Sequence, residues 1–193
     1  DENKLLIISI LSIVIIIIIS FGFYVENKEK KKIKLGNNYI QAKIYLKNNK
    51  KELSKNILKE IIFSNDSTYS TLALFLMVDE NISANNKEIS QLFEHVLQNN
   101  KFEEEVKNLI IFKKAVVQTN FVSESELLDS LNPLINSDTL WKSHALYLLG
   151  DYFYSKREYL KAKEFYTKIL SIKDLNKEMY EQVRSQLALL IND

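Results

Sequence analysis

The chain reads LYLLGDYFYSKREYLKAKEFYTKIL over Leu146–Leu170, and this stretch decides its fold. Two apolar-periodic segments of helical length are joined by a short polar segment, which is typical of a helical hairpin. Four positions define the pattern, because each of the two segments has a small residue followed by an aromatic one. These residues are Gly150 and Phe153 in the first segment, and Ala162 and Tyr166 in the second. Small residues allow two helices to cross closely, and aromatic side chains fill the space beside the crossing. We therefore expect Gly150 to be a packing residue at which Ala is tolerated and a large side chain is not.

The same spacing recurs near the start of the chain, in AKIYLKNNKKELSKNILKEII over residues 42–62. The two stretches overlay without a gap, and the equivalent positions are Ala42, Tyr45, Ser54 and Leu58. This spacing is that of the tetratricopeptide repeat. A third unit around Ala115 fits it more weakly. Hairpins of this kind bury their apolar faces by stacking on their neighbours, so the sequence predicts an all-α, tetratricopeptide-like helical-hairpin solenoid.

The expected helices follow from the apolar periodicity and from the Asn- and Ser-rich breaks between segments. They pair as 33–48 with 51–62, 68–78 with 87–98, 102–119 with 123–136, and 139–155 with 158–171, with a closing helix at 176–191. Ser123 and Glu126 have capping-box spacing. Pro133 is expected to break or kink the sixth helix. The closing helix is expected to cap the open end, with Tyr180, Val183, Leu187 and Leu190 turned inward.

Composition excludes several classes of function. Lys plus Arg number 26 and Asp plus Glu 25, a balance that argues against a nucleic-acid binder. There is no Cys, and the three Gly residues lie too far apart for a phosphate-binding loop. The two His residues fall in different hairpins, so a zinc site is not expected. Without a nucleophile, a metal site or a cofactor motif, the sequence indicates a protein that is not an enzyme.

Residues 5–25 form an apolar run of 21 residues without a charge, LLIISILSIVIIIIISFGFYV. A helix of about 20 apolar residues spans a bilayer core, so we expect a transmembrane helix here. Residues 1–4 are then the end of a longer flank, 26–34 a charged juxtamembrane segment, and 35–193 the tetratricopeptide-like domain. Five Lys residues in 26–34 place that domain in the cytoplasm by the positive-inside rule, although large domains are translocated largely regardless of such charge. These lysines either bind anionic lipid or belong to a solvated helical extension with Glu26 and Lys30 paired, which we favour.

Protein binding is expected on the concave face of the solenoid, which the first helix of each pair lines. The residues predicted for this groove are Tyr39, Lys43, Leu46 and Lys47 in the first pair, and His144, Tyr147, Asp151 and Tyr154 in the last. Tyr combines a large ring with a hydroxyl group and suits peptide recognition. Tyr147 and Tyr154 have a second interpretation, in which they simply pack against the closing helix.

The C-terminal stretch reads LWKSHALYLLGDYFYSKREYLKAKEFYTKILSIKDLNKEMYEQVRSQLALL over residues 140–190. With a single N-terminal span and degenerate hairpins before it, it resembles the YfgM-like family, ancillary subunits of the bacterial SecYEG translocon. The resemblance covers nearly the whole chain, although Leu146 replaces the usual Trp and Asp174 the usual Pro. It implies an inner-membrane protein with a periplasmic domain. It also implies association with SecYEG and with periplasmic chaperones that receive secreted or envelope proteins.

Taken together, these expectations describe a membrane-anchored adaptor that binds protein. A cytoplasm-facing, membrane-anchored scaffold is the alternative that the lysines of 26–34 favour.

Overall fold

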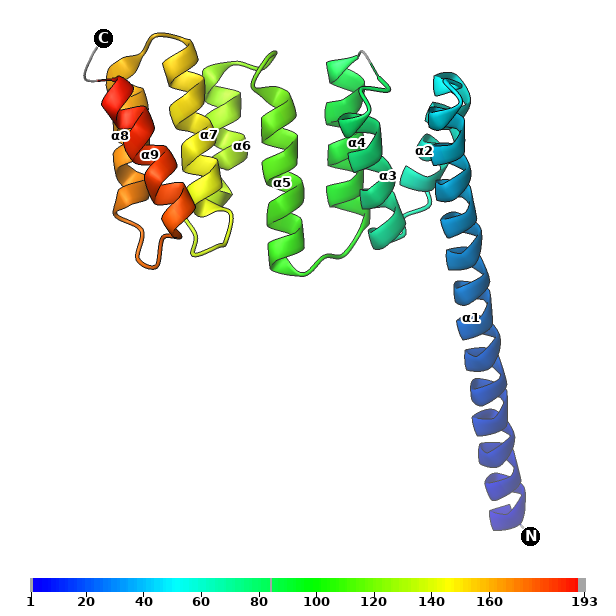
Figure 1. Ribbon diagram of the computed structural model, residues 1–193. Coiled ribbons are helices and arrows are strands. Elements are labelled where there is room, and N and C mark those ends of the chain that lie inside the picture. The colour runs from blue at the N-terminus through cyan, green and yellow to red at the C-terminus, as the bar shows by residue number, and fades with distance from the viewer. Residues whose placement is uncertain (1, 84, 191–193) are drawn as a thin grey trace. The chain divides into compact units, whose positions relative to one another are not determined.

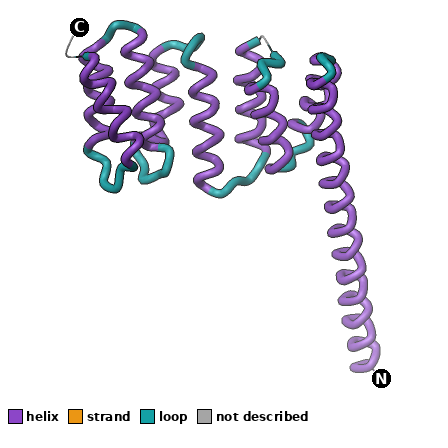
Figure 2. The backbone as a smooth tube through the Cα atoms, in the orientation of Figure 1, coloured by secondary structure: helices purple, strands orange, loops and turns teal. Residues whose placement is uncertain are grey.

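The computed structural model describes residues 2–83 and 85–190, and the side chains of all of them except 2–12 and 14. Within these ranges the chain is all-α and contains no strand (Figure 2). The helices are α1 (Glu2–Lys47), α2 (Lys51–Ile62), α3 (Ser67–Asp79), α4 (Asn86–Asn99), α5 (Glu104–Gln118), α6 (Glu124–Ile135), α7 (Lys142–Ser155), α8 (Tyr159–Leu170) and α9 (Lys177–Leu189) (Figure 1). The predicted helices are confirmed to within a few residues, except that the first is only the end of the much longer α1.

Two compact units make up the chain, Asp1–Met77 and Val78–Asp193. The boundary lies at the end of α3, inside the region expected as one domain. The expected hairpin of 68–78 with 87–98 therefore has one helix in each unit.

The first unit is built on the antiparallel pair α1 and α2 with α3. Its core consists of side chains turned inward from all three helices, namely Leu35, Ala42, Leu58, Ile61, Ile62, Ala73, Leu74 and Met77. Gly36 of α1 lets the hydroxyl of Tyr69 come close, since a Cβ at Gly36 would lie 2.8 Å from that oxygen. Ser70 of α3 donates a hydrogen bond of 3.1 Å to the carbonyl oxygen of Ile61 at the end of α2. These contacts fix α3 against the hairpin.

The N-terminal part of α1 is apolar and exposed. Every described side chain in residues 13–25 is exposed, and nearly all are large and apolar. Among the residues whose side chains the structure describes, no helix is long and apolar enough to cross a membrane. The predicted span, 5–25, lies partly outside them. Farther along α1, Lys30 and Glu26 form the predicted ion pair at 2.6 Å, and Lys31 donates to the carbonyl oxygen of Ser64 at 2.8 Å.

The second unit is a sequential stack in which each helix from α4 to α9 contacts the next one along the chain. The main core joins α5 to α9 through apolar residues that are buried on every helix, namely Ala115, Leu127, Leu131, Leu134, Ala145, Leu146, Leu149, Tyr152, Phe153, Ala162, Phe165, Tyr166, Ile169, Met179 and Val183. Each helix packs mainly against the helices next to it in the sequence. The contacts are therefore between neighbouring elements, as in a repeat array.

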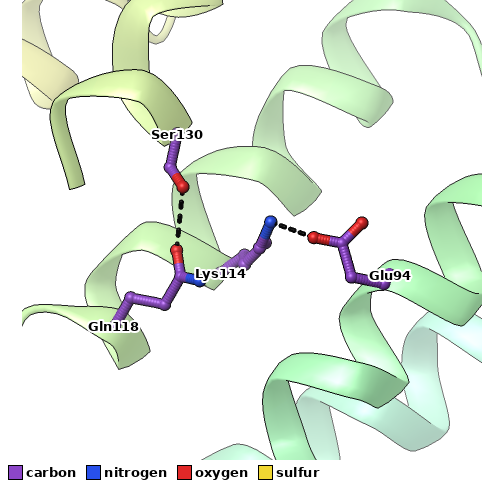
Figure 3. Close-up of polar contacts among 4 residues, drawn as sticks. All are labelled: Glu94, Lys114, Gln118 and Ser130. Atoms are coloured by element: carbon purple, nitrogen blue, oxygen red, sulfur yellow. Dashed lines mark hydrogen bonds and ion pairs between the residues drawn. The ribbon is translucent and has the colours of Figure 1, made fainter. Parts of the chain in front are cut away.

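Polar side chains tie neighbouring helices of this stack together (Figure 3). Lys114 of α5 pairs with Glu94 of α4. One turn farther on, Gln118 accepts a hydrogen bond of 3.0 Å from Ser130 of α6. One helix thus reaches both of its neighbours through side chains spaced four residues apart.

The start of α6 carries the predicted capping box. Ser123 Oγ accepts a hydrogen bond from the backbone N–H of Glu126, and Glu126 Oε2 accepts one of 2.9 Å from the backbone N–H of Ser123. The prediction for Pro133 is wrong as to a break, because α6 runs through it and ends two residues later at Ile135. Pro133 lacks the N–H that would donate to the carbonyl oxygen of Asp129, so α6 lacks one helical hydrogen bond near its C-terminal end and still continues to Ile135.

The two stretches overlaid in the sequence share the same loop geometry. Asn49 and Arg157, at equivalent positions, both have left-handed backbones with φ of 56° and 63°. The same backbone hydrogen bond closes each loop, from Lys50 N to Tyr45 O at 2.8 Å and from Glu158 N to Phe153 O at 2.9 Å. The sequence similarity between α1–α2 and α7–α8 therefore extends to the conformation of the turn.

Gly150 lies inside α7 and is buried, as expected. The crossing with α8 is closer than the sequence indicated, because a Cβ at Gly150 would lie 2.7 Å from Tyr166 Cδ1 and closer still to Cε1. Tyr166 is fully buried and cannot swing its ring away. The expectation that Ala is tolerated at this position is therefore wrong. The equivalent pair in the first unit keeps the same order, a small residue on the first helix and a larger one on the second, with Ala42 on α1 and Leu58 on α2, both fully buried.

We predict that Gly150→Ala lowers the free energy of unfolding by about 1–3 kcal/mol, because the added methyl group overlaps the Tyr166 ring. Tyr166→Leu in the same chain recreates the Ala–Leu pair of the first unit. The double variant should therefore be more stable than the sum of the two single changes indicates. Chemical unfolding followed by circular dichroism measures all three variants. A Gly150→Ala variant as stable as the parent chain would contradict the close crossing of α7 and α8.

Candidate protein-binding site

A hollow of about 330 Å³ opens on the face of α7 that the sequence assigned to the groove. His144, Tyr147 and Asp151 line it, because residues three and four apart share one face of a helix. The other walls come from α5, from the residue that precedes α9, and from α9 itself. The remaining lining residues are Phe112, Leu148, Asn176, Glu178, Met179 and Gln182.

Asp151 is held in place by the core residue Tyr166. The Tyr166 hydroxyl donates a hydrogen bond of 2.6 Å to Asp151 Oδ1. Burial raises the pKa of the Asp151 carboxyl above its usual range, and the hydrogen bond from Tyr166 partly offsets this. Burial, together with the same hydrogen bond, raises the pKa of Tyr166 well above its ordinary value. The carboxyl group is thus fixed by a phenol that stays protonated.

Tyr147 lines the hollow together with Asp151 and lies against Tyr166. Its ring centroid lies 5.6 Å from that of Tyr166, at an interplanar angle of 54°. Burial, and then the charge of Asp151, raise the pKa of the Tyr147 hydroxyl, while a hydrogen bond with Gln186 of α9 lowers it. Tyr147 therefore contacts the closing helix and also lines the hollow. The two interpretations of this residue in the sequence, packing against the closing helix and lining a groove, both apply.

Aromatic rings from two helices form one end of the site. Phe112 of α5 stacks on Trp141 at a centroid distance of 5.4 Å. His144 lies 5.5 Å from Trp141 and meets Phe112 edge-on at 6.0 Å. A second hollow, of about 430 Å³, begins on the other side of His144 and is lined by Glu105, Asp138, Thr139, Leu140, Lys142, Ser143, His144, Ile172, Lys173, Asp174, Leu175 and Asn176.

A polar chain fixes the start of α7 against α5, and thereby positions these rings. Asn108 of α5 donates to Thr139 Oγ1 at 3.0 Å, and the Thr139 hydroxyl donates to Glu105 Oε2 at 2.9 Å. The backbone N–H of Trp141 also donates to Thr139 Oγ1, at 3.3 Å. Asn108 is buried, so its side-chain amide needs this partner.

Of the four groove residues predicted in the last hairpin, three line the hollow and Tyr154 does not. The ring of Tyr154 lies against Tyr159 of α8, with centroids 5.6 Å apart. The four residues predicted in the first hairpin belong to the other unit. There, Tyr39 and Leu46 are half-buried, whereas Lys43 and Lys47 are exposed.

Sequence reasoning did not identify the walls that face α7. Phe112, Glu178 and Gln182 come from helices that were assigned only to packing. On α9 the expectation is confirmed for Val183, which is buried, and for Leu187 and Leu190, which pack against the core, but it is wrong for Tyr180, which is 39% exposed. Met179 is 6% exposed and turns inward instead. The i, i+4 spacing of Glu178 and Gln182 was visible in the sequence, but nothing there placed that face opposite α7.

The site has the character of a recognition surface. Its walls combine aromatic and apolar side chains with a nearly equal share of polar surface, so a ligand can be bound by shape and oriented by polar groups. Among the described side chains, no three His, Asp or Glu residues gather as a metal ion would require. Comparisons of the chain with protein-family models, with curated proteins and with solved structures gave no match.

We predict that Asp151→Asn gains stability relative to the parent chain as the pH rises from acid to neutral. The pKa of Asp151 is raised in the folded state, so its bound proton stabilises the fold below the ordinary pKa, and this contribution is lost as the pH rises through the folded pKa. Asn has no proton to lose and can still accept from Tyr166. Since Asp151 keeps contact with solvent, the gain should stay below about 1 kcal/mol.

The measurement is the free energy of unfolding of both chains at a series of pH values. Asp129→Asn, at an exposed position on α6, is the matched control and should follow the parent chain. The opposite trend, with Asp151→Asn losing stability as the pH rises, would contradict the raised pKa.

Proposed function

We propose that this protein is a membrane-anchored adaptor that binds segments of other proteins in the hollow on α7. The observation that carries the proposal is the meeting of His144, Tyr147 and Asp151 with walls from two other helices around one cavity. Large aromatic side chains at such a site supply contact area at low entropic cost. The arrangement suits binding rather than catalysis, and we propose no enzymatic activity.

The fold that we propose for residues 35–193 is a tetratricopeptide-like solenoid. Its support is the pair of equivalent hairpins, which share a left-handed turn residue, a closing hydrogen bond and a small–large contact between helices. The sequential stacking of α4 to α9 is also what repeat units require to bury their apolar faces.

The membrane anchor in this proposal is the helix of residues 5–25. Its support is the uncharged run in the sequence and the exposure of every described side chain in 13–25. Water makes such a surface unfavourable, whereas lipid accepts it. Since α1 runs without a break to Lys47, the anchor and the first helix of the first hairpin would be one continuous rod.

The partners that we propose come from the resemblance to the YfgM-like family. On that basis the anchor places the domain in the periplasm beside SecYEG in a bacterial inner membrane. There the adaptor would link secreted or envelope proteins to periplasmic chaperones. The alternative is a cytoplasm-facing scaffold, supported by the exposed lysines of residues 26–34.

We predict that alkaline phosphatase fused after Asp193 is active in bacterial cells, because the enzyme folds only outside the cytoplasm. A cytoplasmic reporter fused at the same position should be inactive. The reverse result for the two fusions would reject the periplasmic orientation and favour the scaffold.

We predict that Tyr147→Ala in the full-length chain reduces the recovery of soluble partners in a crosslinking pull-down from native membranes. Tyr154→Ala is the matched control, since Tyr154 lies on the same helix but outside the hollow. Translocon recovery should persist in both variants if the anchor mediates it. Circular dichroism confirms folding, and Gln182→Trp, at an exposed wall position, tests the site without altering the core. Unchanged recovery of every soluble partner with folded Tyr147→Ala and Gln182→Trp would contradict binding in the hollow.

A further inference from the structure

The charged groups that line the hollow all have one sign. Asp151 and Glu178 are its only charged lining residues, and neither Lys nor Arg is among the rest. The chain as a whole has 26 basic and 25 acidic residues, so the hollow is locally negative on a chain whose total charge is nearly neutral. The two carboxyl groups come from different helices, α7 and α9, and share one cavity.

Neither carboxyl group has an ion-pair partner among residues 2–83 and 85–190. Other acids of the same unit do have one: Lys161 pairs with Glu124 at 2.8 Å and with Glu158 at 2.7 Å, and Lys168 pairs with Glu164 at 2.7 Å. Lysines are thus abundant around the stack, yet none neutralises the hollow. Both carboxyl groups are exposed and therefore accessible to a basic group of a partner.

The remaining walls match the other parts of a long cationic side chain. Phe112 and Tyr147 line the hollow with aromatic rings, and a cation within about 6 Å of a ring centroid is attracted by it. The unit already makes such contacts on its outer surface, where Lys161 lies 4.9 Å from the centre of Phe153. Leu148 and Met179 provide apolar surface for an aliphatic stem.

We propose that the hollow binds a Lys or Arg side chain of a partner segment, with its charged group between Asp151 and Glu178 and its stem against the apolar wall. This inference rests on the proposed function and names what the site recognises. The volume of about 330 Å³ is near the lower end for ligand sites, so it suits one side chain whose backbone stays outside. Arg fits best, because its planar group stacks on rings and binds carboxylates through two hydrogen bonds.

The chain offers a direct reporter for this site. It has two Met residues, and Met179 lines the hollow whereas Met77 is fully buried in the other unit. Full-length protein with ¹³C-labelled methionine methyl groups, held in lipid nanodiscs, is titrated with the peptide acetyl-Ala-Leu-Arg-Leu-Ala-amide. The matched probe carries citrulline in place of Arg, which keeps the shape of the side chain and removes its charge.

We expect the Met179 signal to shift saturably with the Arg peptide, the citrulline peptide to bind about tenfold more weakly or worse, and Met77 to stay unchanged. Glu178→Gln should weaken binding of the Arg peptide by a similar factor. Glu181→Gln, on the same helix but outside the lining, should not.

Equal shifts with both peptides, no shift of Met179 with the Arg peptide, or equal loss in Glu178→Gln and Glu181→Gln would each overturn the inference. The pull-down with Tyr147→Ala tests the proposed function separately. If partner recovery depends on Tyr147 while the Arg peptide leaves Met179 unmoved, the adaptor function stands and the basic-side-chain specificity fails. If neither effect is seen, both fail.

Discussion

The contact between Tyr166 and Gly150 is the constraint on which the second unit depends. Because Gly150 has no side chain, α8 can bring the Tyr166 ring flat against the backbone of α7. The same ring extends its hydroxyl to Asp151 and lies against Tyr147, so one core residue fixes two residues of the hollow. Core packing and the geometry of the hollow are therefore not separate features here. A substitution that alters the packing of Gly150 and Tyr166 therefore also displaces Tyr147 and Asp151.

The two equivalent hairpins show which part of the pattern is conserved physically and which part varies. Both keep the left-handed turn and its closing hydrogen bond, which set how the second helix leaves the first. The sizes within the pair differ, with Ala42 and Leu58 in one unit and the smaller Gly150 beside the larger Tyr166 in the other. Cores tolerate such exchanges when the total volume is kept. Only the second pair supplies a hydroxyl group, which donates to Asp151 of the hollow.

Local information in the sequence predicted most of the fold. Apolar periodicity and Asn-rich breaks located the helices after residue 33, and the capping box at Ser123 was correct. The tolerance expected for Ala at Gly150 failed because it depends on the distance to a ring on another helix. About half of the site was predicted from the sequence, because His144, Tyr147 and Asp151 share one face of a predicted helix. The opposite walls needed the tertiary contacts that bring Phe112 and Glu178 to that face, and a single sequence carries no signal for them.

The unbroken course of α1 has a mechanical meaning. A helix turns by about 100° and rises by about 1.5 Å for each residue. The number of residues between the apolar segment and Leu35 therefore sets both the height and the rotational phase of the first hairpin relative to that segment. The length of residues 26–34 thus sets the orientation of the first unit. Adding or removing one of these residues would turn that unit by more than a quarter of a revolution about the α1 axis.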